Sequence, residues 1–463
     1  MRGLRELRGR GADRVRPRRR GQGRPPAGCR RRRRPGSSHR GRAQLPGRCH
    51  PAGGRVTARV VVVGASVGGV RTVAELRTAG FAGEIVLVDP DAARPYDRPP
   101  LSQQVLAGSW APDRAGLGDP VRRWEATVAA TRAVQLDPGA RVVDLESGER
   151  LGYDRLVIAT GALARRLPGP PREGVHVLRT LQDCLELRAD LERGGPLVVI
   201  GGGLTGAEVA STARGLGVPV TLVEALPAPM ARVVGERAGG LFTQLHRAHG
   251  VDVRCGVAVD RIEGHPRVRE VVLADGRRLP ADTVAVGIGV SPGTDWLAGS
   301  GLRVRDGVLA DEFLAATADR TVFAIGDVAR WYDRCLGRHV RVEHWTNAVE
   351  GAGVAAHNIV HPDSPRVHDA IPYVWSEQHG TKIQLVGRVN PQWEIAVVEG
   401  DAERGRRAVL YHDGIWVHAA LTMNWPQALA VVRRGLATEL EVAAVQAELQ
   451  PKAFRRPLAP ARR

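Results

Sequence analysis

The motif GASVGG at residues 64–69 and the motif GGGLTG at residues 201–206 decide the fold of this chain. An apolar segment precedes each motif, at residues 59–63 and 197–200, and an alanine-rich amphipathic segment follows it. The β-branched residues of the apolar segments run without polar alternation, which predicts buried parallel strands. The glycines permit a tight turn and bring the backbone close to a pyrophosphate at the N-terminus of the next helix. The two motifs therefore predict two dinucleotide sites, with electrons passing between them.

An acidic residue follows the second predicted strand of each unit. Asp89 comes after the segment 84–88 and Glu224 after the segment 220–223, which places them 20 and 18 residues beyond the last glycine of each motif. A carboxylate at this spacing accepts hydrogen bonds from a ribose diol and repels a 2′-phosphate. Since no arginine directly follows Glu224, we expect the second site to favour NADH over NADPH.

Charge is distributed unevenly along the 463 residues, whose formal net charge is +18. Residues 1–57 hold nineteen arginines against Glu6 and Asp13, and the tail 451–463 holds five basic residues and no acid. The body between them is close to neutral, so the high pI does not indicate a nucleic-acid-binding protein. We expect residues 1–57 to be disordered, because they cannot bury enough apolar surface to fold. We also hypothesise that they are not native protein and that translation starts near Val56.

Targeting and metal signals are missing from the sequence. No apolar run approaches the roughly eighteen residues that a membrane span needs, and residues 1–57 lack the apolar core of a secretory signal. The five cysteines are scattered, with no metal-like cluster. We therefore expect a cytoplasmic protein without a nucleic-acid, membrane or metal partner.

The order of predicted strands and turns predicts an α/β fold. It contains two Rossmann-like dinucleotide-binding domains, one nested within the other, and a C-terminal α+β domain. The first domain would be formed by residues 58–170 and 293–365, and the second by residues 171–292. Residues 366–463 would form an interface domain that ends in the basic tail.

Several further motifs lie in order along the chain. They are PYDRPPLS at residues 95–102, ATG at 159–161, AIGD at 324–327, RVEHWTNA at 341–348 and WSEQ at 375–378. Together with the two glycine motifs, they resemble the FAD-dependent ferredoxin reductases of the glutathione-reductase-like superfamily. This group includes putidaredoxin, rhodocoxin and biphenyl-dioxygenase ferredoxin reductases, and the resemblance covers residues 58 to about 440.

This resemblance implies FAD in the first domain and NADH in the second. The residues that would hold FAD are Gly64, Ser66, Gly69, Asp89, Arg98, Gly161 and Asp327. The residues that would hold NADH are Gly201, Gly203, Gly206, Glu208 and Glu224. Trp345 and Trp375 would lie near the flavin edge, the alternative being that both are core or interface residues. Asp327 could equally be a helix cap.

Two residues depart from the pattern of the family. Ser66 replaces the second glycine of the first motif, and we expect FAD binding to survive this change. Gln103 stands where the family usually has a lysine that pairs with the glutamate matching Glu208. The loss of this cation changes the electrostatics at the reactive edge of the flavin. We therefore predict that flavin reduction is slower or less favourable than in a lysine-bearing relative, with Gln103, Glu208, Trp345 and Trp375 as the catalytic set.

The electron acceptor follows from what the sequence lacks. No cysteine lies between Gly69 and Gly161, where disulfide reductases and peroxidases of the superfamily carry theirs. We expect electrons to pass singly from FAD to a small [2Fe-2S] or related ferredoxin that serves a P450 or a ring-hydroxylating dioxygenase. A basic face would attract such an acidic partner, and the candidates are Arg330, Arg334, Arg338 and Arg341. The alternatives are an NADH-dependent reductase of a quinone or small radical, and a low-turnover redox sensor resembling apoptosis-inducing factor.

Overall fold

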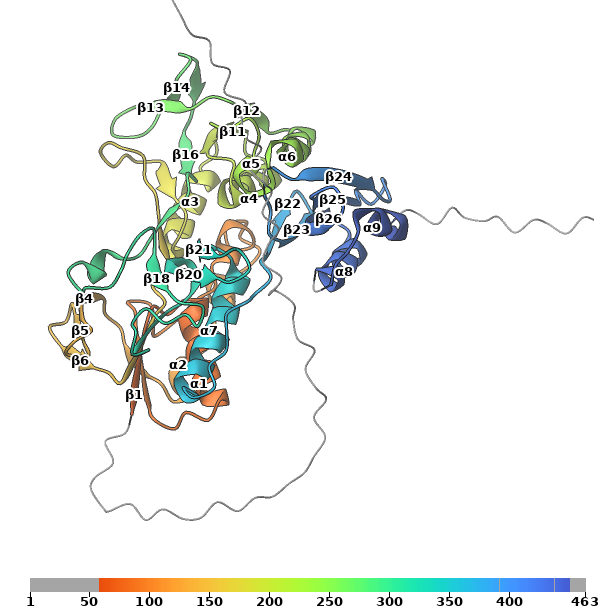
Figure 1. The fold of residues 1–463 in the computed structure, drawn as a ribbon. Coiled ribbons are helices and arrows are strands. Elements are labelled where there is room, and N and C mark those ends of the chain that lie inside the picture. The colour runs from red at the N-terminus through yellow and green to blue at the C-terminus, as the bar shows by residue number, and fades with distance from the viewer. Residues whose placement is uncertain (1–57, 391, 437, 450–463) are drawn as a thin grey trace, which may run out of the picture.

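The computed structural model describes residues 58–390, 392–436 and 438–449 (Figure 1). Two predictions, the disordered and non-native segment 1–57 and the basic tail 451–463, lie outside the described residues. No helix in the described ranges is long and apolar enough to cross a membrane.

The first sheet has five parallel strands, and the first glycine motif follows its central strand. In spatial order the strands are β19 (Val322–Ala324), β7 (Arg155–Ile158), β1 (Arg59–Val63), β2 (Glu84–Val88) and β3 (Thr127–Ala129). Strand β1 is buried along nearly its whole length, as its unbroken run of valines predicts. Sequence order and spatial order differ as in a doubly wound fold, in which the ligand cleft lies beyond the carboxyl ends of the strands.

The second sheet repeats this plan around the second glycine motif. Its five parallel strands are β12 (Asp252–Cys255), β11 (Val220–Glu224), β10 (Leu197–Ile200), β16 (Thr283–Val286) and β9 (Val175–Val177). All of them come between β7 and β19 in the chain, so the second sheet is nested within the first. This confirms the predicted fold class, whereas the domain boundaries near residues 170, 292 and 365 stay predictions.

Two helices follow the glycine motifs directly, and a third covers the first sheet. They are α1 (Val67–Thr78), α4 (Leu204–Gly215) and α7 (Trp345–Val360). Helices α1 and α7 lie side by side on the first sheet (Figure 1). Their close approach is possible because α7 buries Ala348, Gly351, Ala352 and Ala355 instead of larger side chains. The remaining helices are α2 (Pro120–Trp124), α3 (Leu181–Glu192), α5 (Ala231–Val234), α6 (Glu236–Ala248), α8 (Pro426–Gly435) and α9 (Val442–Leu449).

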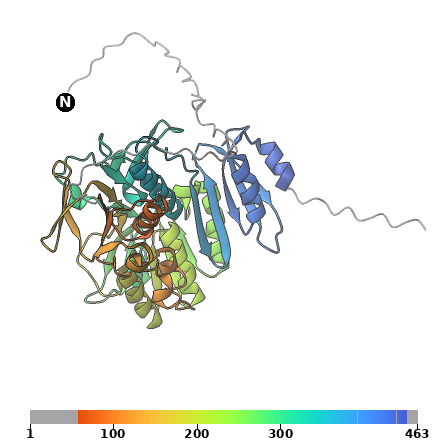
Figure 2. The same ribbon diagram turned by 90° about the horizontal axis from the view of Figure 1, so that it is seen from below.

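The C-terminal region contains a five-stranded antiparallel sheet that packs beside the helices of the second sheet (Figure 2). Its strands, in spatial order, are β22 (Tyr373–Gln378), β23 (Thr381–Gly387), β26 (Val417–Met423), β25 (Arg407–His412) and β24 (Glu394–Glu399). Helices α8 and α9 close one face over a core that includes Val432 and Val445. On the other face, Tyr411 donates a hydrogen bond of 2.7 Å to the carbonyl of Val234 beside α6.

Four smaller sheets complete the fold. They are β4 (Ala133–Asp137) with β5 (Val142–Leu145) and β6 (Arg150–Gly152), β13 (Val259–Glu263) with β14 (Glu270–Leu273) and β15 (Arg278–Pro280), β18 (Val308–Ala310) with β20 (Ala329–Asp333) and β21 (Arg338–Val340), and β8 (Ala162–Ala164) with β17 (Val290–Pro292). The last pair joins the two parallel sheets where the chain returns to the first one. There the amide of Gly293 donates to the carbonyl of Gly161 at 2.9 Å, and the Thr160 hydroxyl donates to the carbonyl of Gly293 at 2.7 Å.

Candidate active site

Two glycines in the first motif are required by the backbone geometry of the turn after β1. Gly64 has a φ of +110°, and a Cβ there would lie 2.3 Å from the carbonyl oxygen of Ala159. A Cβ on Gly69 would lie 1.7 Å from the carbonyl oxygen of Gly64. Neither position therefore admits a side chain, because the segment after β7 lies against Gly64 and α1 starts against the carbonyl of Gly64.

The second motif repeats this geometry. Gly201 has a φ of +101° and would place a Cβ 2.4 Å from the carbonyl of Gly287, while a Cβ on Gly206 would lie 1.9 Å from the carbonyl of Gly201. At Gly203 a Cβ would meet no atom within 4 Å, so the surface of this turn is open to a ligand. The two turns are thus local copies of one structure in different parts of the chain.

Each motif is tied to its predicted acidic residue by a backbone hydrogen bond. The amide of Ala65 donates to the Asp89 carboxylate at 3.0 Å, and the amide of Gly202 donates to the Glu224 carboxylate at 2.7 Å. Each carboxylate also accepts from an amide of its own loop, that of Asp91 or Leu226, at 2.8 Å. Both acids are therefore held beside the turn, in the place predicted for a ribose contact.

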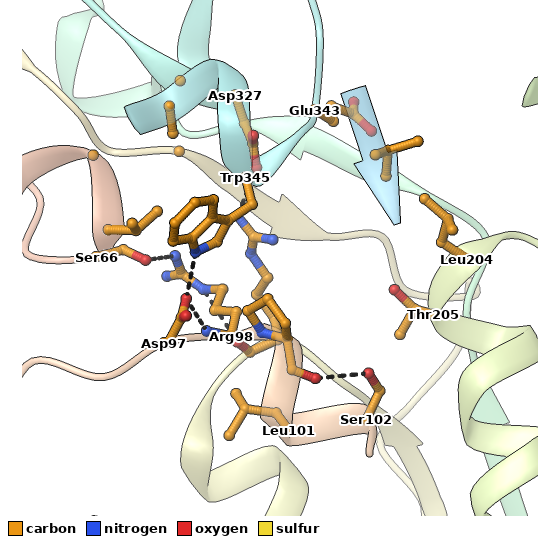
Figure 3. A pocket seen from close by; sticks show the side chains of 18 of the residues that line it. Ser66, Asp97, Arg98, Leu101, Ser102, Leu204, Thr205, Asp327, Glu343 and Trp345 are labelled. Carbon is orange, nitrogen blue, oxygen red and sulfur yellow. Dashed lines mark hydrogen bonds and ion pairs between the residues drawn. The ribbon is translucent and has the colours of Figure 1, made fainter. Parts of the chain in front are cut away.

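A cleft opens where the two motifs face each other (Figure 3). Its empty volume is about 1140 Å³, which includes space that is open to solvent. Eight of the predicted site residues line it: Ser66, Arg98, Gln103, Gly161, Glu208, Asp327, Trp345 and Trp375. Gly64, Gly69 and Asp89 of the first unit do not line the cleft. Gly201, Gly203, Gly206 and Glu224 are not cleft-lining residues, although Leu204 and Thr205 of the second unit are.

Two partly buried arginines lie beside the first turn. Arg98 donates to the Ser66 hydroxyl at 2.5 Å, so the residue that replaces a glycine binds this guanidinium (Figure 3). Arg179 also lines the cleft and donates to Asp327 at 3.0 Å. Burial, together with the charge of Arg179, lowers the pKa of Arg98 to about 10. The guanidinium stays charged at neutral pH, and two cations so close together favour an anionic ligand.

Two tryptophans form one wall of the cleft. The Trp345 indole Nε1 donates to Asp97 at 2.9 Å (Figure 3), and burial raises the pKa of that carboxyl. The rings of Trp345 and Trp375 meet edge to face, with their centroids 5.6 Å apart. Trp345 begins α7 and Trp375 lies in β22, so this contact joins the C-terminal sheet to the first domain. Both rings line the cleft, and their place near a flavin edge stays a prediction.

Glu208 is the buried acid of the cleft, and two segments of the chain supply its partners. It lies in α4 with 8% of its surface exposed. The hydroxyl of Ser102 donates to Oε2 at 2.5 Å and the hydroxyl of Ser376 donates to Oε1 at 2.6 Å. Burial raises the pKa of Glu208, while hydrogen bonds from Ser102, Ser376 and Gln103 lower it. Among the described residues no cation forms an ion pair with Glu208, so Gln103 does stand beside it as an uncharged partner.

Sequence reasoning missed three contributors to the site. Arg179 is an isolated arginine after a short strand, and no local pattern indicates its role. Ser102 and Ser376 lie within motifs that the sequence did single out, but their contact with Glu208 joins residues 106 and 168 positions apart. No spacing rule covers such distances.

The docking arginines that we predicted differ in how free their charges are. Arg330 and Arg341 both bind Asp306, at 3.2 Å and 3.1 Å. Arg334 and Arg338 are exposed in the hairpin of β20 and β21, without an ion pair to any described residue. Only the second pair presents an uncompensated positive charge.

No described cysteine lines the cleft. Cys184 lies in α3, five residues after the cleft-lining residue Arg179. Its Sγ is buried and donates to the carbonyl of Leu101 at 3.1 Å. Burial raises the pKa of this thiol to about 11, so it is not a reactive thiolate at neutral pH.

The helix ends around the cleft match a phosphate-containing ligand. The N-cap residues of helices α1, α4 and α7 are Ser66, Gly203 and His344, and none of them caps its helix with a side-chain hydrogen bond. Amide groups at these starts therefore remain available. With Arg98 and Arg179 nearby, they can bind pyrophosphate groups.

Comparison with known proteins agrees with this geometry. Residues 58–352 match the family described as pyridine nucleotide-disulphide oxidoreductase, and residues 373–453 match one described as reductase C-terminal. The biphenyl dioxygenase system ferredoxin–NAD(+) reductase component of Paraburkholderia xenovorans is 38% identical over 396 residues, which cover 84% of this chain and 95% of that protein.

Two solved structures share the fold along most of their length. The ferredoxin reductase for the CYP199A2 system from Rhodopseudomonas palustris has a TM-score of 0.80 and 30% identity, and the match covers 86% of this chain and 98% of that one. Putidaredoxin reductase, solved in a covalent complex with putidaredoxin, has a TM-score of 0.78 and 31% identity, with coverage of 84% and 95%.

Proposed function

Because the chain belongs to the pyridine nucleotide-disulphide oxidoreductase family, and resembles ferredoxin–NAD(+) reductases over most of its length, we propose that it is an NADH:ferredoxin oxidoreductase containing FAD. The observation that carries this proposal is the cleft between the two dinucleotide turns, which no described cysteine lines. Electrons that arrive from NADH therefore have no thiol relay to pass through.

The residues of the first turn would hold FAD, and those of the second would hold NADH. Gly64 and Gly69 let the backbone approach a pyrophosphate, Ser66 and Arg98 stand beside it, and Asp89 is placed for a ribose. Gly161 and Asp327 complete the wall that β7 and β19 provide. In the second unit, Gly201, Gly203 and Gly206 form the turn, and Glu224 would select NADH because a 2′-phosphate would meet its carboxylate.

Bound FAD supplies hydride acceptance followed by release of single electrons. The chain supplies position and charge. Glu208 and Gln103 lie at the part of the cleft closest to the second unit, and Trp345 and Trp375 form its aromatic wall. An acidic [2Fe-2S] or related ferredoxin, serving a P450 or a ring-hydroxylating dioxygenase, is the proposed acceptor. Its proposed docking face includes Arg334 and Arg338, and the proposed location is the cytoplasm.

Anaerobic titration of the FAD-loaded protein tests the first half of this proposal. NADH should bleach the absorbance of oxidised flavin at a far lower concentration than NADPH. The second half is tested by adding ferredoxin to NADH and cytochrome c, which should raise the rate of cytochrome reduction strongly, and less at high salt.

The alternative functions predict different results in these same assays. Rapid quinone reduction without ferredoxin would identify a reductase of small molecules. A long-lived NADH complex with little turnover would identify a redox sensor. Protein that retains no flavin would contradict all three. For the docking face, the Arg334→Glu, Arg338→Glu double variant should weaken ferredoxin dependence, whereas the Arg122→Glu, Arg123→Glu double variant in α2 is the control with the same change in charge.

A further inference from the structure

Glu208 lies at one end of a row of buried polar side chains that leads out of the cleft. The row continues through Ser376 and Gln378 of β22 to His246 of α6, and ends at His379 in the turn after β22. Ser376, Gln378 and His246 are each no more than 1% exposed. Buried polar groups without a partner are costly, so such a row needs an explanation.

Three links of this row have hydrogen-bond distances. Ser376 Oγ donates to Glu208 Oε1 at 2.6 Å, Gln378 Nε2 donates to Ser376 Oγ at 3.1 Å, and His379 Nε2 lies 3.0 Å from His246 Nδ1. In the remaining gap, Gln378 Oε1 and His246 Nε2 are both buried, and neither atom has a hydrogen-bond partner in the structure. An unsatisfied acceptor and an unsatisfied ring nitrogen at the ends of the two recorded segments can satisfy each other, so this fourth link is part of the inference and not an observed hydrogen bond.

Only one arrangement of protons satisfies every link. The Gln378 carbonyl oxygen can only accept, so His246 must carry its proton on Nε2. His246 Nδ1 is then an acceptor, which places a proton on Nε2 of His379. Every donor in the row therefore points toward Glu208, and the dipoles of the four bonds add along one direction.

The charges at the two ends agree with this direction. Arg214 and His249 lie at the outer end, where His249 stacks on His379 with ring centroids 4.4 Å apart. At the inner end, Glu208 also accepts from Ser102 and Gln103, and the charge of Glu377 opposes its ionisation. None of the described neighbours that bind the carboxylate is a cation.

We propose that His379, His246, Gln378 and Ser376 form a one-way hydrogen-bond chain that keeps Glu208 ionised and oriented in the cleft. They are positioning residues, because they act through Glu208. The effect of this hydrogen-bond chain on catalysis rests on the proposed function. An ionised Glu208 in the cleft would stabilise the positive charge that NADH acquires when it loses a hydride. The hydrogen-bond chain supplies part of the stabilisation of the Glu208 carboxylate that a neighbouring cation would otherwise give.

The test is an infrared titration of the FAD-loaded protein, which needs no turnover. The carboxylic-acid C=O band of Glu208 is identified by its loss in Glu208→Gln, and its appearance is followed as the pH is lowered. In His246→Phe the midpoint should rise by at least about one pH unit, a tenfold increase in proton affinity. Gln378→Met breaks the chain closer to Glu208 and should shift the midpoint at least as far.

One control separates this effect from a general loss of packing. Thr422→Val removes another buried hydroxyl that has no partner. It should not move the midpoint. The double variant of His246 and Gln378 should shift it no further than Gln378→Met alone, because both substitutions break one chain.

Unchanged midpoints in folded His246→Phe and Gln378→Met proteins, with melting temperatures near that of the parent, would overturn the inference. Equal shifts in Thr422→Val would overturn it too, since they would show a packing effect. Failure of the proposed function would instead appear as missing ferredoxin-dependent turnover, with the titration shifts intact.

Discussion

Replacing Gln103 with lysine should accelerate reduction of the flavin by NADH. Glu208 is buried and bound by hydroxyl and amide donors only, so a lysine at this position would give it its first cationic partner. At an effective dielectric constant of about 20, two unit charges about 4 Å apart attract by about 4 kcal/mol. Desolvation of the ammonium opposes this gain, which leaves a decrease of about 1–3 units in the pKa of Glu208.

The same cation would also act on the hydride, which carries negative charge into the cleft. Since each pKa unit corresponds to about 1.4 kcal/mol or a factor of ten, we expect the rate constant to rise by about tenfold. The assay is stopped-flow bleaching of oxidised flavin at saturating NADH. The infrared midpoint of Glu208 should move to lower pH in parallel.

Gln104→Lys is the matched control, because it adds the same charge at the next residue. Gln104 lies outside the cleft-lining set, and its substitution should change the rate constant by less than about twofold. A bleaching rate in Gln103→Lys that equals that of the parent, in protein with full flavin content, would refute the reasoning. Equal acceleration by both substitutions would show that the effect is a general one of net charge.

The remaining predictions concern the turns and the buried histidines. Gly69→Ala should abolish FAD retention, because its Cβ would meet the backbone, whereas Gly68→Ala should keep it, since the nearest atom would lie 3.5 Å away; flavin absorbance of the purified proteins decides. Glu224→Ser should shift the preference between NADH and NADPH toward NADPH by about tenfold or more, measured as the ratio of kcat/KM, and an unchanged ratio would contradict the assigned ribose contact. His368 is buried, and its Nε2 lies 3.0 Å from Oδ1 of Asn347. Burial lowers the pKa of His368 to about 4. Because the unfolded chain binds a proton near pH 6.5 and the folded chain does not, the free energy of unfolding should fall by about 2 kcal/mol between pH 7 and pH 5 on account of this residue. In urea unfolding experiments, the free energy of unfolding of His368→Gln should fall less between pH 7 and pH 5 than that of the parent.

Local patterns carry most of what the sequence predicted correctly. The strands at residues 59–63, 84–88 and 197–200 have the predicted bounds, because unbroken β-branched runs between glycines leave few alternatives. The glycine spacing likewise indicates each turn, since Gly69 and Gly206 pack on the carbonyl groups of residues only five positions earlier. Such contacts join residues within one short stretch of the chain, so the local sequence predicts them.

The sequence by itself thus determined the two nested dinucleotide folds, the absence of a cysteine after the first motif, and the uncharged residue at position 103. Only the tertiary structure decided what surrounds Glu208. Its partners Ser102 and Ser376 come from a loop of the first domain and a strand of the C-terminal sheet, and His246 comes from a helix of the second. Side chains that meet through the packing of three separate sheets leave no periodic signal along the chain, because their spacing in sequence is set by everything that folds between them.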